Sequence, residues 1–269
     1  MADIDAARLR AQLVPPYHTI EVVSSTGSTN ADLRKSAIEG AADRTVLIAE
    51  EQTAGVGRRA RPWSSPKGGG IYLSVLLRPR EVPFAGLGTL AIVAGLAVTD
   101  LTAGLGADAA LKWPNDVLAG PERGKCAGIL AEAIMADQPA VVLGIGLNVR
   151  PLGADVPPGA GGLRPASLAE VGARTTDRTE IAALLLSALA EREGAWRAAD
   201  GDLGRAGLIE EYRARCETLG REVRVLLPGD ASLTGTAVDV DSSGRLTVLD
   251  DQGHRHTVFS GDVVHLRMV

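Results

Sequence analysis

The chain has 269 residues, 45% of them hydrophobic and 23% charged, which is the composition of a globular protein long enough for one sizeable domain and a second small one. Its formal net charge of −5 argues against a general nucleic-acid binder or a membrane-surface protein. Two cysteines without a Cys-x-x-Cys pair indicate a reducing compartment and no structural disulfide or zinc site, so we expect a cytoplasmic protein.

The first part of the chain alternates predicted helices and strands. The segment before residue 19 carries acidic residues and no apolar core, which argues against a signal peptide. Ser28, Thr29 and Asn30 are candidate N-caps of a helix that stops at Gly40. The apolar stretch 84–106 contains glycines and the charged Asp100, so we interpret it as a buried helix rather than a membrane span. The predicted order is helix 3–13, strand 19–25, helix 28–40, strand 45–50, strand 71–78 and helix 84–106.

The second part of the chain predicts the centre of a sheet and then a small β module. After a strand at 109–113 and a turn, two strongly apolar segments, 126–134 and 139–149, suit central strands. A Pro/Gly-rich run at 151–165 is typical of a loop or linker, and helical patterns follow at 177–199 and 203–217. From residue 220, short β-rich runs alternate with turns and predict about five strands in a small closed barrel or sandwich. We therefore divide the chain into an α+β domain, 1–217, and a small all-β domain, 218–269.

The letters GVGRRA at 55–60 fit the G-x-G-x-x-G/A pattern of a dinucleotide-binding turn. Such a turn must open a helix whose N-terminus receives the pyrophosphate, but Pro62, Pro66 and the triple glycine at 68–70 cannot form one. We therefore interpret residues 52–70 as a long basic loop, called the arginine loop below. Its positively charged residues are Arg58, Arg59, Arg61 and Lys67.

Four polar clusters lie at the ends of predicted elements, where functional sites usually collect. They are residues 28–30, the arginine loop, 112–116 together with 124–128, and 144–148. Taken singly, each has an ordinary explanation as a helix cap, a turn, a solvated charge or close strand packing. Taken together, the arginines and Lys125 suit a carboxylate or a phosphate, Gln52 suits a neutral polar head group, and the glycines permit close approach of the backbone.

Other common arrangements are less well supported by the sequence. It contains neither a G-x-S-x-G elbow nor a G-x-x-x-x-G-K-[ST] loop, so any ATP must be held in another way. His254 and His256 would share one strand face and could bind a metal, but exposed strand histidines are the better interpretation.

Six blocks within residues 27–149 carry a resemblance to a known family. In chain order they read GSTN, EEQTAGVGRRARPW, GGGIYLS, LKWPNDVL, GKCAGIL and GIGLNV. In these blocks the chain resembles the biotin protein ligases, also called biotin-[acetyl-CoA-carboxylase] ligases. The resemblance implies an α+β fold with a mixed sheet flanked by helices, similar to class II aminoacyl-tRNA synthetase and lipoate ligase catalytic domains, and a C-terminal SH3-like barrel. It also implies a two-step reaction, in which biotin and MgATP form biotinyl-5′-AMP and a carrier lysine then takes the biotin.

The resemblance further implies roles for individual residues. Lys125 and Arg58 would be catalytic by offsetting negative charge at the biotin carboxylate and the α-phosphate, while Asp116 would orient either the lysine amine or Mg²⁺. The implied biotin-binding residues are Ser28, Thr29, Asn30, Gln52, Gly55, Val56, Gly57, Arg58, Lys125, Gly128, Gly144 and Gly146. The implied ATP- and adenylate-binding residues are Arg58, Arg59, Arg61, Trp63, Lys112, Asn115, Lys125 and Asn148. The implied cofactors are ATP and Mg²⁺, without an identified protein ligand for the metal, and the implied partner is the biotin carrier domain of an acyl-CoA carboxylase.

Three positions depart from the family pattern. Val56 stands where the first arginine of the loop is usual, Ala60 where its last glycine is usual, and Cys126 where leucine is common. The segment before His18 is too short for a helix-turn-helix domain, so we expect no DNA-binding role. An edge strand of the catalytic sheet could pair with a second copy, which would give a homodimer.

Two alternative functions stay open at this point. One is a lipoate or octanoate ligase or transferase of the same fold, in which Cys126 could accept an acyl group. The other is a non-catalytic, biotin-responsive regulator. The KWPND block and the arginine loop with Gln52 favour the biotin ligases over the first, and the joint presence of Lys125, Arg58 and Asp116 disfavours the second.

Overall fold

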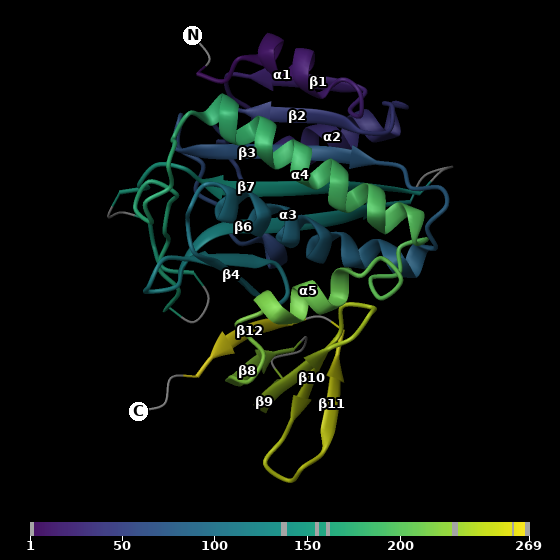
Figure 1. The fold of residues 1–269 in the computed structure, drawn as a ribbon, viewed down its shortest axis with the longest axis vertical. Coiled ribbons are helices and arrows are strands. Elements are labelled where there is room, and N and C mark those ends of the chain that lie inside the picture. Colours follow the sequence, from purple (N-terminus) through teal and green to yellow (C-terminus); the bar gives the residue numbers. More distant parts are fainter. Residues whose placement is uncertain are drawn as a thin grey trace.

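Two β-sheets form the framework of the molecule, a seven-stranded mixed sheet and a five-stranded antiparallel sheet (Figure 1). The computed structural model describes residues 3–135, 139–153, 156–159, 162–227, 231–259 and 261–266. The strands are β1 (Thr19–Val23), β2 (Thr45–Ala49), β3 (Gly70–Leu77), β4 (Ala109–Lys112), β5 (Asp116–Ala119), β6 (Gly124–Ile134), β7 (Ala140–Asn148), β8 (Glu222–Leu226), β9 (Ser232–Val240), β10 (Leu246–Leu249), β11 (Arg255–Val258) and β12 (Asp262–His265). The helices are α1 (Ala6–Leu13), α2 (Thr29–Ile38), α3 (Leu90–Gly104), α4 (Arg178–Ala198) and α5 (Leu208–Arg215), with 3-10 helices η1 (Arg58–Ala60) and η2 (Phe84–Thr89).

The large sheet has the strand order β1-β2-β3-β7-β6-β5-β4, with β1 and β2 parallel and the other neighbours antiparallel. Strand β7 is the middle strand and is buried at almost every position, which suits its nearly continuous apolar sequence. The prediction that the segments 126–134 and 139–149 form central strands is therefore confirmed.

The two faces of the large sheet are covered by different helices. Side chains alternate between faces along each strand. On one face, Val75 and Leu143 belong to the main hydrophobic core, which includes the buried sides of α3 and α4. On the other face, Leu76 and Val142 pack with Leu33 of α2 in a smaller cluster. Figure 1 shows α3 and α4 lying across the front of the sheet, so the helix α2 is left to cover part of the opposite face.

The apolar stretch from Phe84 begins as η2 and continues as α3. By length and composition the segment Phe84–Gly104 passes the test for a membrane-crossing helix, but 67% of its most apolar window is buried inside the fold. Helix α3 packs against α4 and against β4 and β6. The prediction of a buried core helix is confirmed.

The C-terminal strands β8 to β12 form the second sheet, in the order β11-β10-β9-β8-β12, which confirms the predicted set of about five short strands. Side chains from the end of β4 join it to the large sheet. The Lys112 ammonium donates to the Val263 carbonyl at 2.6 Å, and the Trp113 indole donates to the Gly244 carbonyl at 2.9 Å. Both donors are buried, so these contacts between the two sheets are shielded from water.

The structure changes the boundaries of two predicted helices and shows what residues 151–165 do. The predicted helix 203–217 is reduced to α5, because the Asp202 side chain accepts from the amides of Gly204 and Arg205 in a turn and Gly207 adopts a left-handed conformation before the helix. The predicted helix 84–106 begins in 3-10 geometry. Of the two readings of residues 151–165, a loop or a linker, the structure supports the loop, since its end contacts the large sheet where the Lys125 amide donates to the Arg164 carbonyl at 2.7 Å. Residues 154–155, 160–161 and the predicted turn 228–230 lie outside the described residues.

Candidate functional site

The floor of the site is a row of residues on one face of the large sheet, beyond the N-terminal end of α2. Two of these residues are glycines. Val142, Gly144, Gly146 and Asn148 lie on one face of β7 because side chains alternate along a strand. Val142 packs beneath α2, whereas the two glycines leave space above the sheet. The register aligns Gly144 with Ser74 of β3 and Gly146 with Gly128 of β6, so the neighbouring strands extend the same row.

A chain of neutral hydrogen bonds crosses one end of this row. Asn30, from the first turn of α2, lies directly above Gly144, where a Cβ atom would collide with its amide group. The Ser74 hydroxyl lies 2.6 Å from Asn30 Oδ1 and 2.7 Å from Thr29 Oγ1. Gln52 Oε1 accepts from the Thr29 amide at 2.9 Å. Asn30, Thr29 and Ser74 are buried and present hydroxyl and amide groups, and Asn30 Nδ2 also donates to the Glu132 carboxylate at 2.7 Å, so this end of the site is polar and preorganised.

Trp63 of the arginine loop lies above the next glycines in the row. A Cβ atom on Gly146 would stand 2.6 Å from Trp63 Cε2, and one on Gly128 would stand 3.2 Å from its Cζ3. The indole Nε1 is buried without a hydrogen-bond partner among the described residues. The Lys125 ammonium lies over the ring, 5.2 Å from its centroid. The two glycines are therefore required for the indole to approach the sheet.

Three charged side chains, two lysines and one aspartate, lie at the other end of the row. Lys125 Nζ lies 2.6 Å from Asp116 Oδ1, and Lys112 Nζ lies 3.9 Å from Asp116 Oδ2. Burial lowers the pKa of Lys112, and the nearby Asp116 charge opposes that shift. The Lys112–Asp116 pair spans the turn between β4 and β5, so the KWPND block brings a cation and an anion together by its own geometry.

The arginine loop is held by the C-terminal sheet through Asp262. Its carboxylate lies 2.5 Å from Arg61 Nη2, 3.4 Å from Arg59 Nη1 and 4.0 Å from Arg58 Nη1. Arg58 also donates to the Gly261 carbonyl at 3.1 Å. Burial lowers the pKa of the Arg58 guanidinium, and the Asp262 charge opposes this shift. One carboxylate from the small sheet thus contacts three cations of the loop and offsets part of their positive charge.

The two departures in the arginine loop have different structural consequences. Ala60 has a φ of 55°, in the left-handed region that favours glycine, so alanine at this position costs about 1–2 kcal/mol. Val56 forms a β-bridge with Pro62, which uses its backbone, while its side chain is exposed. The loop therefore has an internal backbone pairing at the position where the family usually has an arginine.

The structure brings most of the sequence-predicted site residues together around a single cavity. Those that line it are Ser28, Thr29, Asn30, Gln52, Val56, Gly57, Arg58, Arg61, Trp63, Lys112, Asn115, Asp116, Lys125, Gly128, Gly144, Gly146 and Asn148. Two predicted residues do not line it. Gly55 is paired within the loop, where its carbonyl accepts from the Trp63 amide at 2.8 Å, and Arg59 donates to the Leu226 carbonyl of the C-terminal sheet at 3.0 Å.

Several residues of the cavity are absent from the sequence prediction. Tyr72, Leu152, Val156, Pro157, Leu163, Pro165, Asp262 and Val263 line it, and Ser74 lies beneath Thr29 and Asn30. Tyr72 and Ser74 belong to the GGGIYLS block, and their spacing of two along a strand could have indicated them. No local signal points to Asp262, because its partners lie about two hundred positions earlier in the chain.

Comparison with known proteins decides the family. The chain matches the Biotin/lipoate A/B protein ligase family over residues 19–148 and the Biotin protein ligase C terminal domain over residues 218–266. It is 46% identical to the Biotin--[acetyl-CoA-carboxylase] ligase of Mycobacterium tuberculosis, over 98% of this chain and 96% of that protein. The chain belongs to the biotin protein ligase family.

Further biotin protein ligases agree with this assignment. The Biotin--[acetyl-CoA-carboxylase] ligase of Paracoccus denitrificans is 34% identical over 87% of this chain and 95% of that protein. The structure of the biotin protein ligase from Aquifex aeolicus in complex with biotin and ATP matches with a TM-score of 0.75 and 28% identity, over 94% of this chain and 100% of that chain. The predicted mixed α/β fold with a separate small C-terminal β domain is confirmed.

The environment of Cys126 argues against the acyl-transferase alternative. Its side chain is fully buried, and burial raises the pKa of the thiol to about 12. A thiol of that pKa is protonated at neutral pH and is a poor nucleophile. Cys126 is therefore a packing residue of β6. It fills a buried position at which leucine is common in the family.

Proposed function

We propose that this biotin protein ligase is an ATP-dependent, AMP-forming biotin-[acetyl-CoA-carboxylase] ligase. Biotin carboxylate attacks the α-phosphate of ATP, forming biotinyl-5′-AMP and releasing pyrophosphate. The ε-amine of one lysine on a carboxylase's biotin carrier domain then attacks the acyl carbon, and AMP leaves. The observation that carries the proposal is the division of one cavity into a neutral polar end at Asn30 and a cationic end at Lys125 and Arg58.

The neutral end suits the uncharged ring system of biotin. Ser28, Thr29, Asn30 and Gln52 present hydroxyl and amide groups to the cavity, and these groups can both donate and accept hydrogen bonds. Gly144 and Gly146 let the Asn30 amide and the Trp63 indole pack directly on the sheet, which places these two side chains at the wall of the cavity. Val56, Gly57 and Gly128 line the same cavity as Lys125, and Gly55 is paired with Trp63 inside the arginine loop.

The cationic end suits the reacting carboxylate and the phosphates. An anionic carboxylate approaching a polyphosphate is repelled, so fixed positive charge must lie where negative charge gathers. We assign Lys125 and Arg58 to this role, with Arg61 and Lys112 beside them and Arg59 ordering the loop. Arg58, Arg61 and Lys112 already have carboxylate or carbonyl partners, so incoming phosphates would compete with Asp262 and Val263.

Asn148, Asn115 and Trp63 are assigned to the nucleotide. Asn148 donates from its amide to the Lys125 and Ala166 carbonyls, which leaves Oδ1 as a buried acceptor without a partner among the described residues. An unpaired buried acceptor is costly, and the exocyclic amine of adenine is a donor that would satisfy it. The unpaired Trp63 Nε1 is likewise a donor available to a ligand.

Mg²⁺ fits this site as a metal that arrives on ATP. Clusters of three or more acidic, histidine or cysteine side chains that could hold a metal ion are absent from the described part of the chain. Asp116 is the carboxylate between the two lysines, and it can supply one oxygen to a metal whose other ligands are phosphates and water. Bound there, Mg²⁺ would neutralise phosphate charge. Without it, Asp116 holds Lys125 in place, and we favour this positioning role over orientation of the carrier amine.

The remaining assignments concern organisation. We propose a catalytic domain of residues 1–217 and a small barrel of residues 218–269, a cytoplasmic location, and an acyl-CoA carboxylase carrier domain as the partner. The large sheet ends at β1 and β4, and Leu111 of β4 is already bridged to Cys216. Strand β1 is the edge that we propose for pairing with a second copy, with the Ile20 carbonyl already accepting from Arg10 Nε at 2.8 Å.

One experiment tests the proposed function. The protein is incubated with MgATP, biotin and a carrier domain, and the carrier is then probed with streptavidin. We expect labelling by the unmodified protein and its loss in Lys125→Ala and Arg58→Ala. Lipoate in place of biotin should give no loading, and pyrophosphate release should require both biotin and ATP. An unlabelled carrier would refute the ligase assignment, and labelling without activity loss in either variant would refute the assigned catalytic roles.

A further inference from the structure

The two ends of the arginine loop meet at a buried ionic cluster outside the cavity. Glu50 lies just before the loop, and its backbone carbonyl accepts from the Gly68 amide at 3.0 Å, which closes the base. Glu50 is only 2% exposed. Its carboxylate therefore needs partners at the loop base, because an unpaired buried charge is strongly unfavourable.

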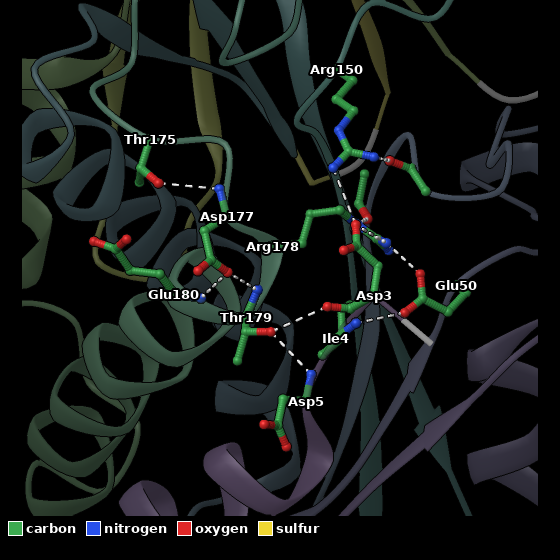
Figure 2. Close-up of polar contacts among 12 residues, drawn as sticks. Asp3, Ile4, Asp5, Glu50, Arg150, Thr175, Asp177, Arg178, Thr179 and Glu180 are labelled. Atoms are coloured by element: carbon green, nitrogen blue, oxygen red, sulfur yellow. Dashed lines mark hydrogen bonds and ion pairs between the residues drawn. The ribbon is translucent and has the colours of Figure 1, made fainter. Parts of the chain in front are cut away.

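Arg178 supplies the main partner from a distant part of the chain. It is the first residue of α4 and is only 1% exposed. Its Nη1 donates to the Glu50 carboxylate, and its Nε donates to the Gly70 carbonyl at 2.8 Å. One planar side chain thus contacts a residue at each end of the arginine loop, as Figure 2 shows for Arg178 and Glu50.

The N-terminal segment braces this pair. The Ile4 amide donates to the second oxygen of Glu50 at 2.8 Å. Asp3 lies 3.1 Å from Arg150 Nη2 and 3.5 Å from Arg178 Nη1 (Figure 2). Arg150 in turn donates to the Gly68 carbonyl at 3.1 Å. Residues from distant segments of the chain therefore converge on the two ends of one loop.

We infer that Glu50 and Arg178 are a positioning pair that holds the arginine loop in its ligand-binding conformation, with Asp3 as an outer brace. Neither member of the pair lines the cavity, so the pair acts through the loop residues that do, such as Gln52, Arg58 and Trp63. A buried ion pair contributes little net stability compared with an apolar replacement. We therefore assign to this pair the role of fixing the geometry of the loop base. A loop with a loose base populates more conformations, and a ligand must then order it before binding. The inference rests on the proposed function only for its kinetic test.

The central variant is Arg178→Lys, which keeps the charge but offers one nitrogen where arginine offers a planar fork. Its matched control is Arg192→Lys on the same helix, since Arg192 pairs with Asp100 and Glu211 away from the loop. Trypsin cleavage after Arg58, Arg59, Arg61 and Lys67 is followed by mass spectrometry in the ligand-free protein. We expect Arg178→Lys to be cleaved about tenfold faster than the unmodified protein and Arg192→Lys to be cleaved at the unmodified rate, since cleavage follows the population of open loop.

The kinetic readout separates positioning from general destabilisation. We expect Arg178→Lys to raise the KM for biotin about tenfold while changing kcat less than about twofold, because saturating ligand restores the ordered loop. If Arg178→Lys does not fold, the exposed Asp3→Ala variant takes its place, with cleavage and KM each raised about threefold. Equal loop cleavage in Arg178→Lys, Arg192→Lys and the unmodified protein would overturn the inference. Absence of pyrophosphate release from every form would refute the proposed function, and the cleavage rates would still decide the role of the pair.

Discussion

The side-chain amide of Asn30 lies directly against the backbone of Gly144. A Cβ atom on Gly144 would collide with Asn30 Oδ1 and stand 2.9 Å from its Cγ. Asn30 also donates to Glu132 at 2.7 Å and lies 2.6 Å from the Ser74 hydroxyl, so it cannot move without breaking buried hydrogen bonds.

Gly144→Ala should therefore weaken biotin binding while the protein stays folded. The added methyl group would push Asn30 from the neutral end of the cavity and leave part of its network unpaired. We expect the biotin Kd to rise about five- to thirtyfold, from the loss of one or two hydrogen bonds of about 1 kcal/mol each. Calorimetric titration with biotin measures this change. Gly194→Ala is the control, because no atom lies within 4 Å of a Cβ atom on that helical glycine. Unchanged binding in Gly144→Ala would contradict the assigned biotin end.

Lys125→Met tests the cationic end of the cavity. The substitution keeps roughly the length of the side chain but removes the charge that faces Asp116 and lies over the Trp63 ring. We expect the rate of pyrophosphate release to fall roughly 10²- to 10³-fold, the usual effect of losing one group aimed at developing charge. Lys35→Met is the control, since Lys35 is an exposed partner of Glu39 on α2. A fall of less than about threefold in Lys125→Met would exclude a catalytic role for Lys125.

Asp262→Asn tests the bond between the C-terminal sheet and the arginine loop. Removing the carboxylate would leave three arginines without their shared anion. We expect the free energy of unfolding to fall by about 1–2 kcal/mol at low salt, and the difference from the unmodified protein to shrink at high salt, where charges are screened. Denaturant unfolding at two salt concentrations measures both effects. Asp239→Asn, which removes one exposed pair with Arg213, should have a smaller effect. A loss of stability that grows with salt would contradict an ionic bond.

His265 predicts how stability depends on pH. Burial, together with the positive charges of Lys112 and Arg221, lowers the pKa of His265 to about 4. The unfolded chain, with an ordinary histidine pKa near 6.5, then binds a proton between pH 6.5 and 4 that the folded protein does not bind. Folding stability from this group should be fully present above about pH 6.5 and should fall as the pH decreases toward 4, by roughly 1 kcal/mol after allowing for partial exposure.

The matched measurement compares urea unfolding of the unmodified protein and His265→Gln across that pH range. Glutamine can keep a hydrogen bond to Thr218, whose hydroxyl lies 3.1 Å from His265 Nε2, but it does not titrate. The difference in unfolding free energy between the two proteins should therefore change between pH 6.5 and 4. A constant difference would show that His265 is not the responsible group.

Most elements of the large sheet and most residues around the cavity could be predicted from the sequence. The apolar runs of β6 and β7 are local signals, and so is the polar triplet at the start of α2, where Ser28 is the N-cap and Thr29 and Asn30 are the first two helical residues. The start of α5 could not be predicted, because a turn at Asp202 takes the place of the first residues of the predicted helix 203–217. The loop at 151–165 has the composition of a linker, although Leu163 and Pro165 line the cavity.

The sequence by itself determined the family and the chemical character of the site, since the arginine loop, the KWPND block and the glycines of β7 each carry their chemistry in a few adjacent residues. Only the tertiary structure decided which distant groups hold that site together. Asp262 reaches the arginine loop from the small sheet, and Arg178 reaches Glu50 from α4. These pairs depend on strand register and helix packing, which bring together charges that no local pattern relates.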